Sequence, residues 1–255
     1  MTVVPPGYRH ETFPVLSSTN DAVLERLAAG DAGNLWITAE RQSAGRGRRG
    51  NVWSSDAGNL FASLGLVDPA PADKAATLSF VAAVALHQAL VNVCGPGIVD
   101  RLALKWPNDV LLDRHKIAGI LIEGQALPAR AFAVVTGVGV NCEHHPGVPG
   151  PFPSASLAGL GYRVRADELF GALSAALADE IALWNGGAGF ASVRAAWLSR
   201  ATGIGDPVTV RLPDAVQDGV FRDIDEEGRL VLGLPGGGTT LITAGEIFFR
   251  QRAET

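Results

Sequence analysis

Cysteine is scarce in this chain, and its scarcity limits the kinds of protein that the sequence can encode. The 255 residues include two cysteines, Cys94 and Cys142, and no Cys-x-x-Cys pair. Two cysteines are too few for the disulfide framework of a small secreted protein, and they fit a reducing compartment. The first residues also lack the basic and then apolar pattern of a signal peptide. We therefore expect a cytoplasmic protein.

An excess of positive charge and an unbroken apolar run are missing as well. The formal net charge is −5, so the chain has no overall electrostatic footprint for nucleic acid, and we expect no DNA partner. The most hydrophobic stretch, residues 75–93, is interrupted by Thr77, Ser79, His87, Gln88 and Asn92. Such a stretch is typical of a buried core helix rather than a membrane span, and we expect no membrane partner.

What the chain does have is ample apolar material in alternating helical and extended patterns. Hydrophobic residues make up 47% of the sequence, enough for a sizeable core. Ser18 and Asp21 have capping-box spacing at the start of a predicted helix, Asp21–Ala29, and Gly30 is a natural terminator. Further helices are expected at 75–93 and 168–184, and strands at 35–39, 60–67, 102–106, 110–112, 116–123 and 132–140.

The pattern of predicted secondary structure changes near residue 202, from mixed helices and strands to strands alone. Beyond it, short β-type runs at 208–211, 220–224, 230–232 and 239–243 are separated by turn residues, including Gly236-Gly237-Gly238. Such spacing predicts a small all-β barrel. We therefore expect two domains, residues 1–202 and residues 203–255, with the second supporting the first.

Residues 45–50 read Gly-Arg-Gly-Arg-Arg-Gly and match the Gly-x-Gly-x-x-Gly pattern of dinucleotide-binding proteins. That fingerprint requires a helix at the third glycine, but residues 51–59 are rich in turn formers and lack helical periodicity. We reject the dinucleotide-binding interpretation on this context.

The same loop is rich in arginine: Arg41, Arg46, Arg48 and Arg49 fall within nine residues without an acid among them. A solvated surface loop would explain them, but glycines and bidentate arginines in an acidic protein favour an anionic ligand.

Lys105-Trp106-Pro107-Asn108-Asp109, followed by Lys116-Ile117-Ala118-Gly119, is the most informative segment. Pro107 cannot donate a hydrogen bond to a sheet, so a turn is expected there, and the segment can be read simply as a hairpin with charged tips. Against that reading, Lys116 opens an otherwise apolar strand in which Gly119 allows a close approach to the backbone. Cys142-Glu143-His144-His145 has no second ligand set and is expected to be an ordinary loop, so no metal ligands are assigned.

Together these segments resemble the biotin protein ligase family. The resemblance rests on Ser18-Thr19-Asn20, Gln42 with residues 45–50 and Trp53, residues 105–109, residues 116–120 with Glu123, residues 137–141, residues 153–157 and the C-terminal β segment. They span nearly the whole chain in the family's order, and this ordered set is far more specific than any single motif. The chain departs from the family in two ways. No helix-turn-helix precedes the matched region, so repressor activity is not implied, and Asn51 stands where relatives often place another arginine.

The resemblance implies an α/β (α+β) catalytic domain on a mixed sheet, followed by the small barrel. It also implies a ligase that uses ATP, biotin and Mg²⁺ to form biotinyl-5′-AMP, and that transfers biotin to a lysine of a biotin carboxyl carrier protein. The implied biotin-binding residues are Ser18, Thr19, Asn20, Gln42, Gly45, Arg46, Gly47, Arg48, Trp53, Lys116 and Gly119. The implied nucleotide-binding residues are Arg46, Arg48, Arg49, Lys105, Asn108, Lys116 and Asn141.

The catalytic roles are expected to fall on Lys116, Arg48 and Asp109. Lys116 would stabilise the activating step, and Arg48 would latch the glycine-hinged loop over a water-sensitive adenylate. Asp109 is a candidate base for the acceptor lysine, and a purely structural turn carboxylate explains it equally well. A lipoate–protein ligase and a non-catalytic biotin-binding module stay open as alternatives, and so does a homodimer. The tryptophan in residues 105–109 favours biotin over lipoate.

Overall fold

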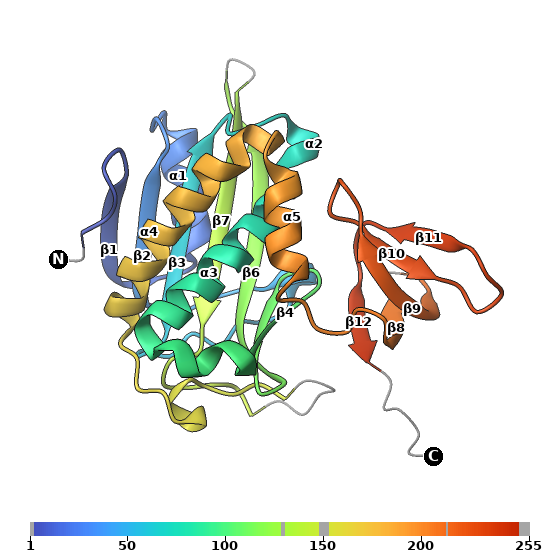
Figure 1. Cartoon of the computed structure of the whole chain (residues 1–255). Helices are drawn as coiled ribbons and strands as arrows, with labels where there is room; N and C mark the ends of the chain where they lie inside the picture. The colour runs from blue at the N-terminus through green and yellow to red at the C-terminus, as the bar shows by residue number, and fades with distance from the viewer. Residues whose placement is uncertain (1–2, 129–130, 148–152, 213, 250–255) are drawn as a thin grey trace.

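The computed structural model describes residues 3–128, 131–147, 153–212 and 214–249, and its larger part is built on a seven-stranded sheet (Figure 1). The strand order is β1-β2-β3-β7-β6-β5-β4. The strands are β1 (Arg9–Leu16), β2 (Leu35–Gln42), β3 (Leu60–Val67), β4 (Leu102–Lys105), β5 (Asp109–Leu112), β6 (His115–Ala126) and β7 (Phe132–Val140). β1 and β2 are parallel, whereas the other neighbouring pairs are antiparallel, so the sheet is mixed as expected.

Helices cover both faces of this sheet. They are α1 (Thr19–Ala28), α2 (Ala72–Ala75), α3 (Leu78–Cys94), α4 (Ala166–Trp184) and α5 (Phe190–Leu198). Figure 1 shows α3, α4 and α5 in front of the sheet and α1 behind it. Side chains on β2 alternate accordingly, because Leu35 and Ile37 join the core under α1, while Trp36 joins the larger core under α3 and α4. The structure adds β1 and α5, which we did not anticipate from the sequence.

The face that carries α1 is lined by small residues, and these set the distance at which other groups approach the sheet. A Cβ atom at Gly65 would come within 2.4 Å of Val23 on α1, and one at Gly137 would come within 2.3 Å of the Asn20 side chain. Because α1 has only 10 residues, it leaves the rest of this face uncovered. That uncovered part of the sheet is the floor of the cavity described below.

The apolar run near residue 80 is a core helix, as expected. The helical stretch Ala72–Cys94 is long and apolar enough to cross a membrane by length and composition, but 67% of its most hydrophobic window is buried inside the protein. α3 packs against α4 and against the sheet. Both faces of the helix therefore have protein partners, which explains why its sequence is apolar nearly all round.

The C-terminal sheet consists of β8 (Pro207–Arg211), β9 (Val216–Ile224), β10 (Leu230–Gly233), β11 (Thr239–Ile242) and β12 (Glu246–Phe249). It is antiparallel with the order β11-β10-β9-β8-β12, and Gly237 and Gly238 turn the chain between β10 and β11 with positive φ angles. This is the small all-β unit that the turn spacing predicted. Its edge strands β11 and β12 do not pair with each other among the described residues, so the expected barrel is not closed.

Hydrogen bonds, one of them fully buried, connect the C-terminal sheet to the rest of the protein. The indole Nε1 of Trp106, which is 1% exposed, donates to the carbonyl oxygen of Gly228 at 3.1 Å. Arg194 on α5 donates through Nε to the carbonyl oxygen of Ile224 at 2.6 Å and pairs with Asp223. Phe80 of α3 packs closely against Gly228, so this turn is held by both an apolar and a polar contact.

We predict that Trp106→Phe destabilises the protein by more than its lost volume explains. The substitution leaves the buried Gly228 carbonyl without its donor, which costs roughly 1–3 kcal/mol. Trp36→Phe is the matched control, because Trp36 is fully buried and its Nε1 has no hydrogen-bond partner among the described residues. Urea unfolding should show a larger loss for Trp106→Phe. Equal losses in the two variants would contradict the role of this hydrogen bond.

Candidate functional site

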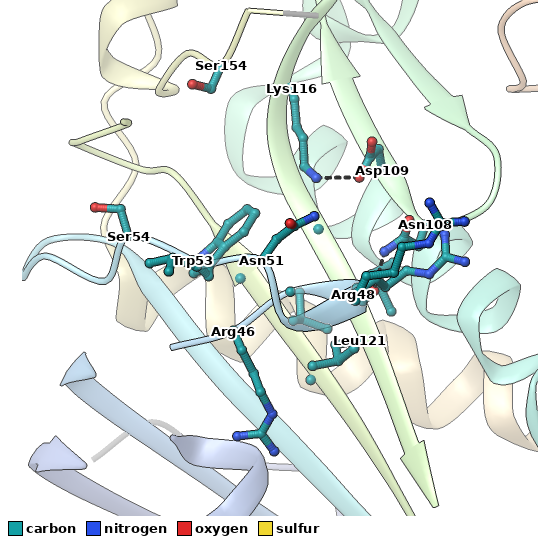
Figure 2. A pocket seen from close by; sticks show the side chains of 18 of the residues that line it. Arg46, Arg48, Asn51, Trp53, Ser54, Asn108, Asp109, Lys116, Leu121 and Ser154 are labelled. Carbon is teal, nitrogen blue, oxygen red and sulfur yellow. Dashed lines mark hydrogen bonds and ion pairs between the residues drawn. The ribbon is translucent and has the colours of Figure 1, made fainter. Parts of the chain in front are cut away.

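A cavity of about 450 Å³ lies over the uncovered part of the sheet, between the loop that follows β2 and the C-terminal sheet. Figure 2 shows side chains from the loop, from the β4–β5 turn and from β6 directed into this space. Of the residues proposed from the sequence, those that line the cavity are Ser18, Thr19, Asn20, Gln42, Arg46, Gly47, Arg48, Arg49, Trp53, Lys105, Asn108, Asp109, Lys116, Gly119 and Asn141. Gly45 does not line the cavity and lies at the base of the loop, against Ser55 and Gln42.

One wall of the cavity is a polar network at the start of α1. Ser18 is the N-cap of the helix and accepts from the main-chain N–H of Asp21. Gln42 at the end of β2 accepts from the main-chain N–H of Thr19 at 2.8 Å through Oε1. The amide nitrogen of Gln42, Nε2, donates to the hydroxyl of Ser55 at 3.0 Å. These bonds fix the amide orientation of Gln42, so the network presents donors and acceptors in fixed places to a ligand.

Ser63 on β3 completes this network, and our sequence reasoning missed it. The side chain is fully buried, and its Oγ lies 2.7 Å from Thr19 Oγ1 and 2.6 Å from Asn20 Oδ1. Asn20 in turn donates through Nδ2 to Glu123 at 2.6 Å. The available signal was a single hydroxyl in the apolar strand Leu60–Val67, because a buried polar side chain needs a partner.

Arg46 anchors the first part of the loop by ion pairs with two carboxylates. Its Nη1 and Nη2 donate to the two oxygens of Asp21 at 2.7 and 2.5 Å, and Nη2 also lies 3.0 Å from Glu123 Oε1. The positive charge of Arg46 is therefore already balanced inside the protein. This pairing makes Arg46 an anchor between α1 and β6 more than a free cation for a phosphate group.

Residues 44–53, the arginine loop, close back on themselves. The N–H of Gly47 donates to Asn51 O at 2.7 Å, and the N–H of Trp53 donates to Gly45 O at 2.9 Å. A 3₁₀ turn at Arg48–Gly50 lies between them, and Arg49 has a positive φ of 57°. No long helix opens at Gly50, which agrees with our rejection of the dinucleotide-binding reading.

The indole of Trp53 lies flat against the backbone of β6 and β7. A Cβ atom at Gly139 would come within 2.6 Å of Trp53 Nε1, and one at Gly119 would come within 3.1 Å of Cζ3. Gly119 therefore does permit a close approach to the strand, and here the approaching group is Trp53. The Nζ atom of Lys116 lies 5.4 Å from the centre of the same ring, so the indole and the ammonium group form one side of the cavity.

Asp109 holds two lysines at the centre of the site. Its carboxylate lies 2.6 Å from Lys116 Nζ, an ion pair drawn in Figure 2. It also lies 3.3 Å from Lys105 Nζ. Burial acts to raise the pKa of Asp109, but the two lysine charges and their hydrogen bonds outweigh it and hold that pKa below its usual value. Asp109 is therefore ionised at neutral pH and orients both ammonium groups.

Arg48 reaches across the cavity to the turn that precedes β12. Its Nη1 lies 3.3 Å from Gly245 O and 3.5 Å from Asn108 Oδ1. Asn108 itself is fixed on β6, because its Nδ2 donates to Ile120 O at 2.6 Å. Burial lowers the pKa of Arg48, and the charge of neighbouring Arg49 adds to the effect. Arg48 is thus a partly buried guanidinium next to a like charge, and a bound anion would stabilise it.

The remaining nucleotide candidate, Asn141, lies at the end of β7. It is 2% exposed, and its Nδ2 donates to Ala155 O at 3.2 Å.

Within the described ranges, no group of three or more His, Cys, Asp or Glu side chains is arranged to hold a metal ion. Residues 142–145 lie outside the helices and strands, and burial raises the pKa of the Cys142 thiol to about 12.

Comparison with known proteins matches both parts of the chain. The family model Biotin/lipoate A/B protein ligase matches residues 12–141, and the model Biotin protein ligase C terminal domain matches residues 203–250. A biotin–acetyl-CoA-carboxylase ligase from Paracoccus denitrificans is 43% identical over 91% of this chain and 97% of its own length. One with the same description from Mycobacterium tuberculosis is 35% identical over 90% of this chain and 85% of its own length.

A solved structure resembles the whole fold. The biotin protein ligase from Aquifex aeolicus in complex with biotin and ATP superposes with a TM-score of 0.77 at 22% identity, covering 96% of this chain and 99% of that chain. At this identity the likeness concerns the arrangement of the elements. It includes the C-terminal sheet, since nearly all of both chains is covered.

We predict that Asp109→Asn destabilises the protein at neutral pH by about 3–5 kcal/mol, because it leaves buried lysine charge without its counterion. The depressed pKa of Asp109 means that its contribution is complete above the unfolded value of about 3.9 and is lost as the pH falls through the lower folded value. Urea unfolding from about pH 7 to about pH 3 should therefore show the two proteins converging.

Asp113→Asn is the control for this prediction. Asp113 pairs with Arg101, but 38% of its side chain is exposed, and pairs of this kind contribute about 0–1 kcal/mol. A loss for Asp109→Asn that is no larger than that of the control, or that does not change with pH, would contradict the buried ion-pair arrangement.

Proposed function

The chain belongs to the biotin protein ligase family, and from this premise we propose that it activates biotin with ATP and transfers it to a lysine of an acceptor protein. In the first step a carboxylate oxygen of biotin attacks the α-phosphorus of ATP, forming biotinyl-5′-AMP and releasing diphosphate. In the second step the acceptor amine attacks the acyl carbon, and AMP and a proton leave. The observation that carries the proposal is the single cavity that joins the polar network, the arginine loop and Lys116.

The first step requires positive charge where two anions meet. At 4 Å each pair of like charges repels by about 4 kcal/mol at an effective dielectric constant of 20. Lys116 is proposed to stabilise the charge that develops at the α-phosphate, since its ammonium group faces the cavity and Asp109 fixes its position. Arg48 supplies a second cation from the opposite wall.

The two ends of the cavity are assigned to the two substrates. The polar network formed by Ser18, Thr19, Asn20 and Gln42 is proposed to bind the polar atoms of biotin, with Arg46 holding that wall together. Asn141, which directly follows β7, is assigned to the adenine. Asn108, Arg49 and Lys105 are assigned to the rest of the nucleotide. Support for this division comes from the fixed side-chain orientations of the network and from the burial of Asn141.

Asp109 is better suited to position Lys116 than to act as the base in the transfer step. Removing a proton from a lysine of pKa about 10.4 at pH 7 costs about 4–5 kcal/mol, and an effective base has a pKa near the working pH. The pKa of Asp109 is instead held below its usual value by the two lysines. We therefore propose a positioning role for this carboxylate.

Mg²⁺ is proposed to enter with the polyphosphate of ATP. The carboxylates among the described lining residues are Asp109 and Glu246. Asp109 is already shared by two lysines, so Glu246 is the side chain best able to hold a cation that is carried mainly by phosphate oxygens. Bound there, the ion would neutralise part of the polyphosphate charge.

The acceptor is proposed to be a biotin carboxyl carrier domain, a proposal supported by the two relatives from Paracoccus and Mycobacterium, which are named as ligases that act on acetyl-CoA carboxylase. We also propose a cytoplasmic location, no DNA partner and a domain boundary between residues 202 and 203. The lipoate ligase alternative shares the family model of residues 12–141, but the match of residues 203–250 to a biotin protein ligase domain favours biotin.

We predict that the purified protein, given ATP, Mg²⁺ and a carrier domain, adds biotin but not lipoate to one lysine of the carrier. Intact-mass spectrometry of the acceptor measures this directly. Lys116→Ala should lower the rate by orders of magnitude, whereas Lys74→Ala on α2, outside the cavity, should leave it unchanged. Modification by lipoate would favour the alternative ligase, and biotin binding without acceptor modification would favour a non-catalytic module.

We predict further that Arg48→Gly releases biotinyl-5′-AMP, because the substitution removes the side chain that connects the arginine loop to Gly245 and Asn108. The variant should label lysines of bystander proteins, detected by blotting and mass spectrometry. Arg114→Gly is the control, since Arg114 is an exposed arginine in the turn between β5 and β6, lies outside the cavity and has a positive φ of 65° that glycine tolerates. Adenylate release and bystander labelling at wild-type levels in Arg48→Gly would rule out a latch at this position.

A further inference from the structure

The C-terminal sheet forms part of the cavity wall, which the sequence did not lead us to expect. Four of its residues line the cavity. They are Arg211 at the end of β8, Gly245 just before β12, and Glu246 and Phe248 within β12. β8 and β12 are paired, with Arg211 opposite Glu246. A charged side chain from a separate sheet thus borders the same space as Lys116 and the arginine loop.

The balance of charge around the cavity is uneven. At one end Arg46 is paired with Asp21 and Glu123, and at the centre Lys105 and Lys116 share Asp109. Among the described residues, in contrast, no carboxylate oxygen lies within 4.0 Å of the guanidinium groups of Arg48, Arg49 or Arg211. These three arginines, which form no ion pair in the described part of the chain, lie where the tip of the arginine loop meets the C-terminal sheet, and Asp109 and Glu246 act on Arg48 only at longer range.

Arg211 is held in a defined place at this end. Its guanidinium carbon lies over the Phe248 ring, 4.7 Å from the ring centre, which is the range of a cation–π contact. Its main-chain carbonyl, not its side chain, accepts a hydrogen bond from Arg49 Nη2 at 3.3 Å. A stacked guanidinium keeps its N–H groups at its edge, where they can bind phosphate oxygens in the bidentate manner typical of arginine.

We propose that Arg211 binds the polyphosphate of ATP, so that the triphosphate lies between the tip of the arginine loop and the C-terminal sheet. The proposal rests on the proposed ATP-dependent function and adds a nucleotide-binding residue to it. A polyphosphate carries several negative charges, and it is most stable where cations are not already paired. The ion-paired end at Arg46 is then left for the uncharged ring of biotin.

This assignment gives the C-terminal sheet a direct part in ATP use. The sheet would contribute a ligand for the leaving diphosphate, and the contacts of Arg48 with Gly245 and of Arg49 with Arg211 would bring the loop tip to the same phosphates. Binding of ATP would therefore draw the arginine loop and the C-terminal sheet together. Biotin binding, at the far end of the cavity, would not depend on Arg211.

The test is the ATP dependence of biotinyl-5′-AMP formation by Arg211→Ala in the full chain. We expect the KM for ATP to rise about tenfold, equivalent to about 1.4 kcal/mol, with the KM for biotin unchanged. Because the substitution keeps the main-chain carbonyl that Arg49 contacts, it isolates the guanidinium group. Arg211→Lys should restore part of the affinity for ATP. Arg222→Ala, an exposed arginine on β9 outside the cavity, is the matched control and should behave as the wild type.

Three results would overturn the assignment while the wild type remains active. The first is an unchanged KM for ATP in Arg211→Ala. The second is a rise in the KM for ATP in Arg222→Ala that equals the rise in Arg211→Ala. The third is a rise in the KM for biotin in Arg211→Ala together with a lower unfolding temperature, which would show a structural role. A wild-type protein that forms no biotinyl-5′-AMP would instead overturn the proposed function itself, and the assignment with it. The two failures are thus distinguishable.

Discussion

The site depends on keeping several positive charges close together inside an acidic protein before any ligand arrives. Neighbouring cations repel, and burial adds a desolvation cost, so each needs a counterion or a fixed support. Asp109 provides the first solution, because its buried carboxylate contacts both Lys105 and Lys116. Asp21 and Glu123 provide the same for Arg46.

The backbone makes this arrangement possible by leaving room next to the sheet. Gly119 and Gly139 let the indole of Trp53 lie against β6 and β7, and Gly137 admits the side chain of Asn20. Larger residues at these positions would push both groups away from the floor of the cavity. The antiparallel pairing of β6 with β7 puts Gly119 directly opposite Gly139, so one indole covers both.

Much of the fold follows from local patterns in the sequence. Capping by Ser18, the terminator Gly30 and the apolar run of β3 are local signals, and the corresponding elements lie where these signals predict them. Several elements were not anticipated, among them β1, α5 and β12. β1 pairs in parallel with β2, and α5 packs on α3 and α4, so both owe their stability to distant partners rather than to a local pattern.

The sequence by itself determined which residue types gather at the site, because the ordered segments from Ser18 to Asn141 already contained most of the cavity lining. Only the tertiary structure decided which of these charges are paired. It showed that Arg46 is balanced by Asp21 and Glu123, that Ser63 joins the polar network, and that Arg211 reaches the cavity from the C-terminal sheet. The physical reason is that an ion pair or a hydrogen bond depends on the distance between two groups in space, and for groups far apart along the chain only the fold sets this distance.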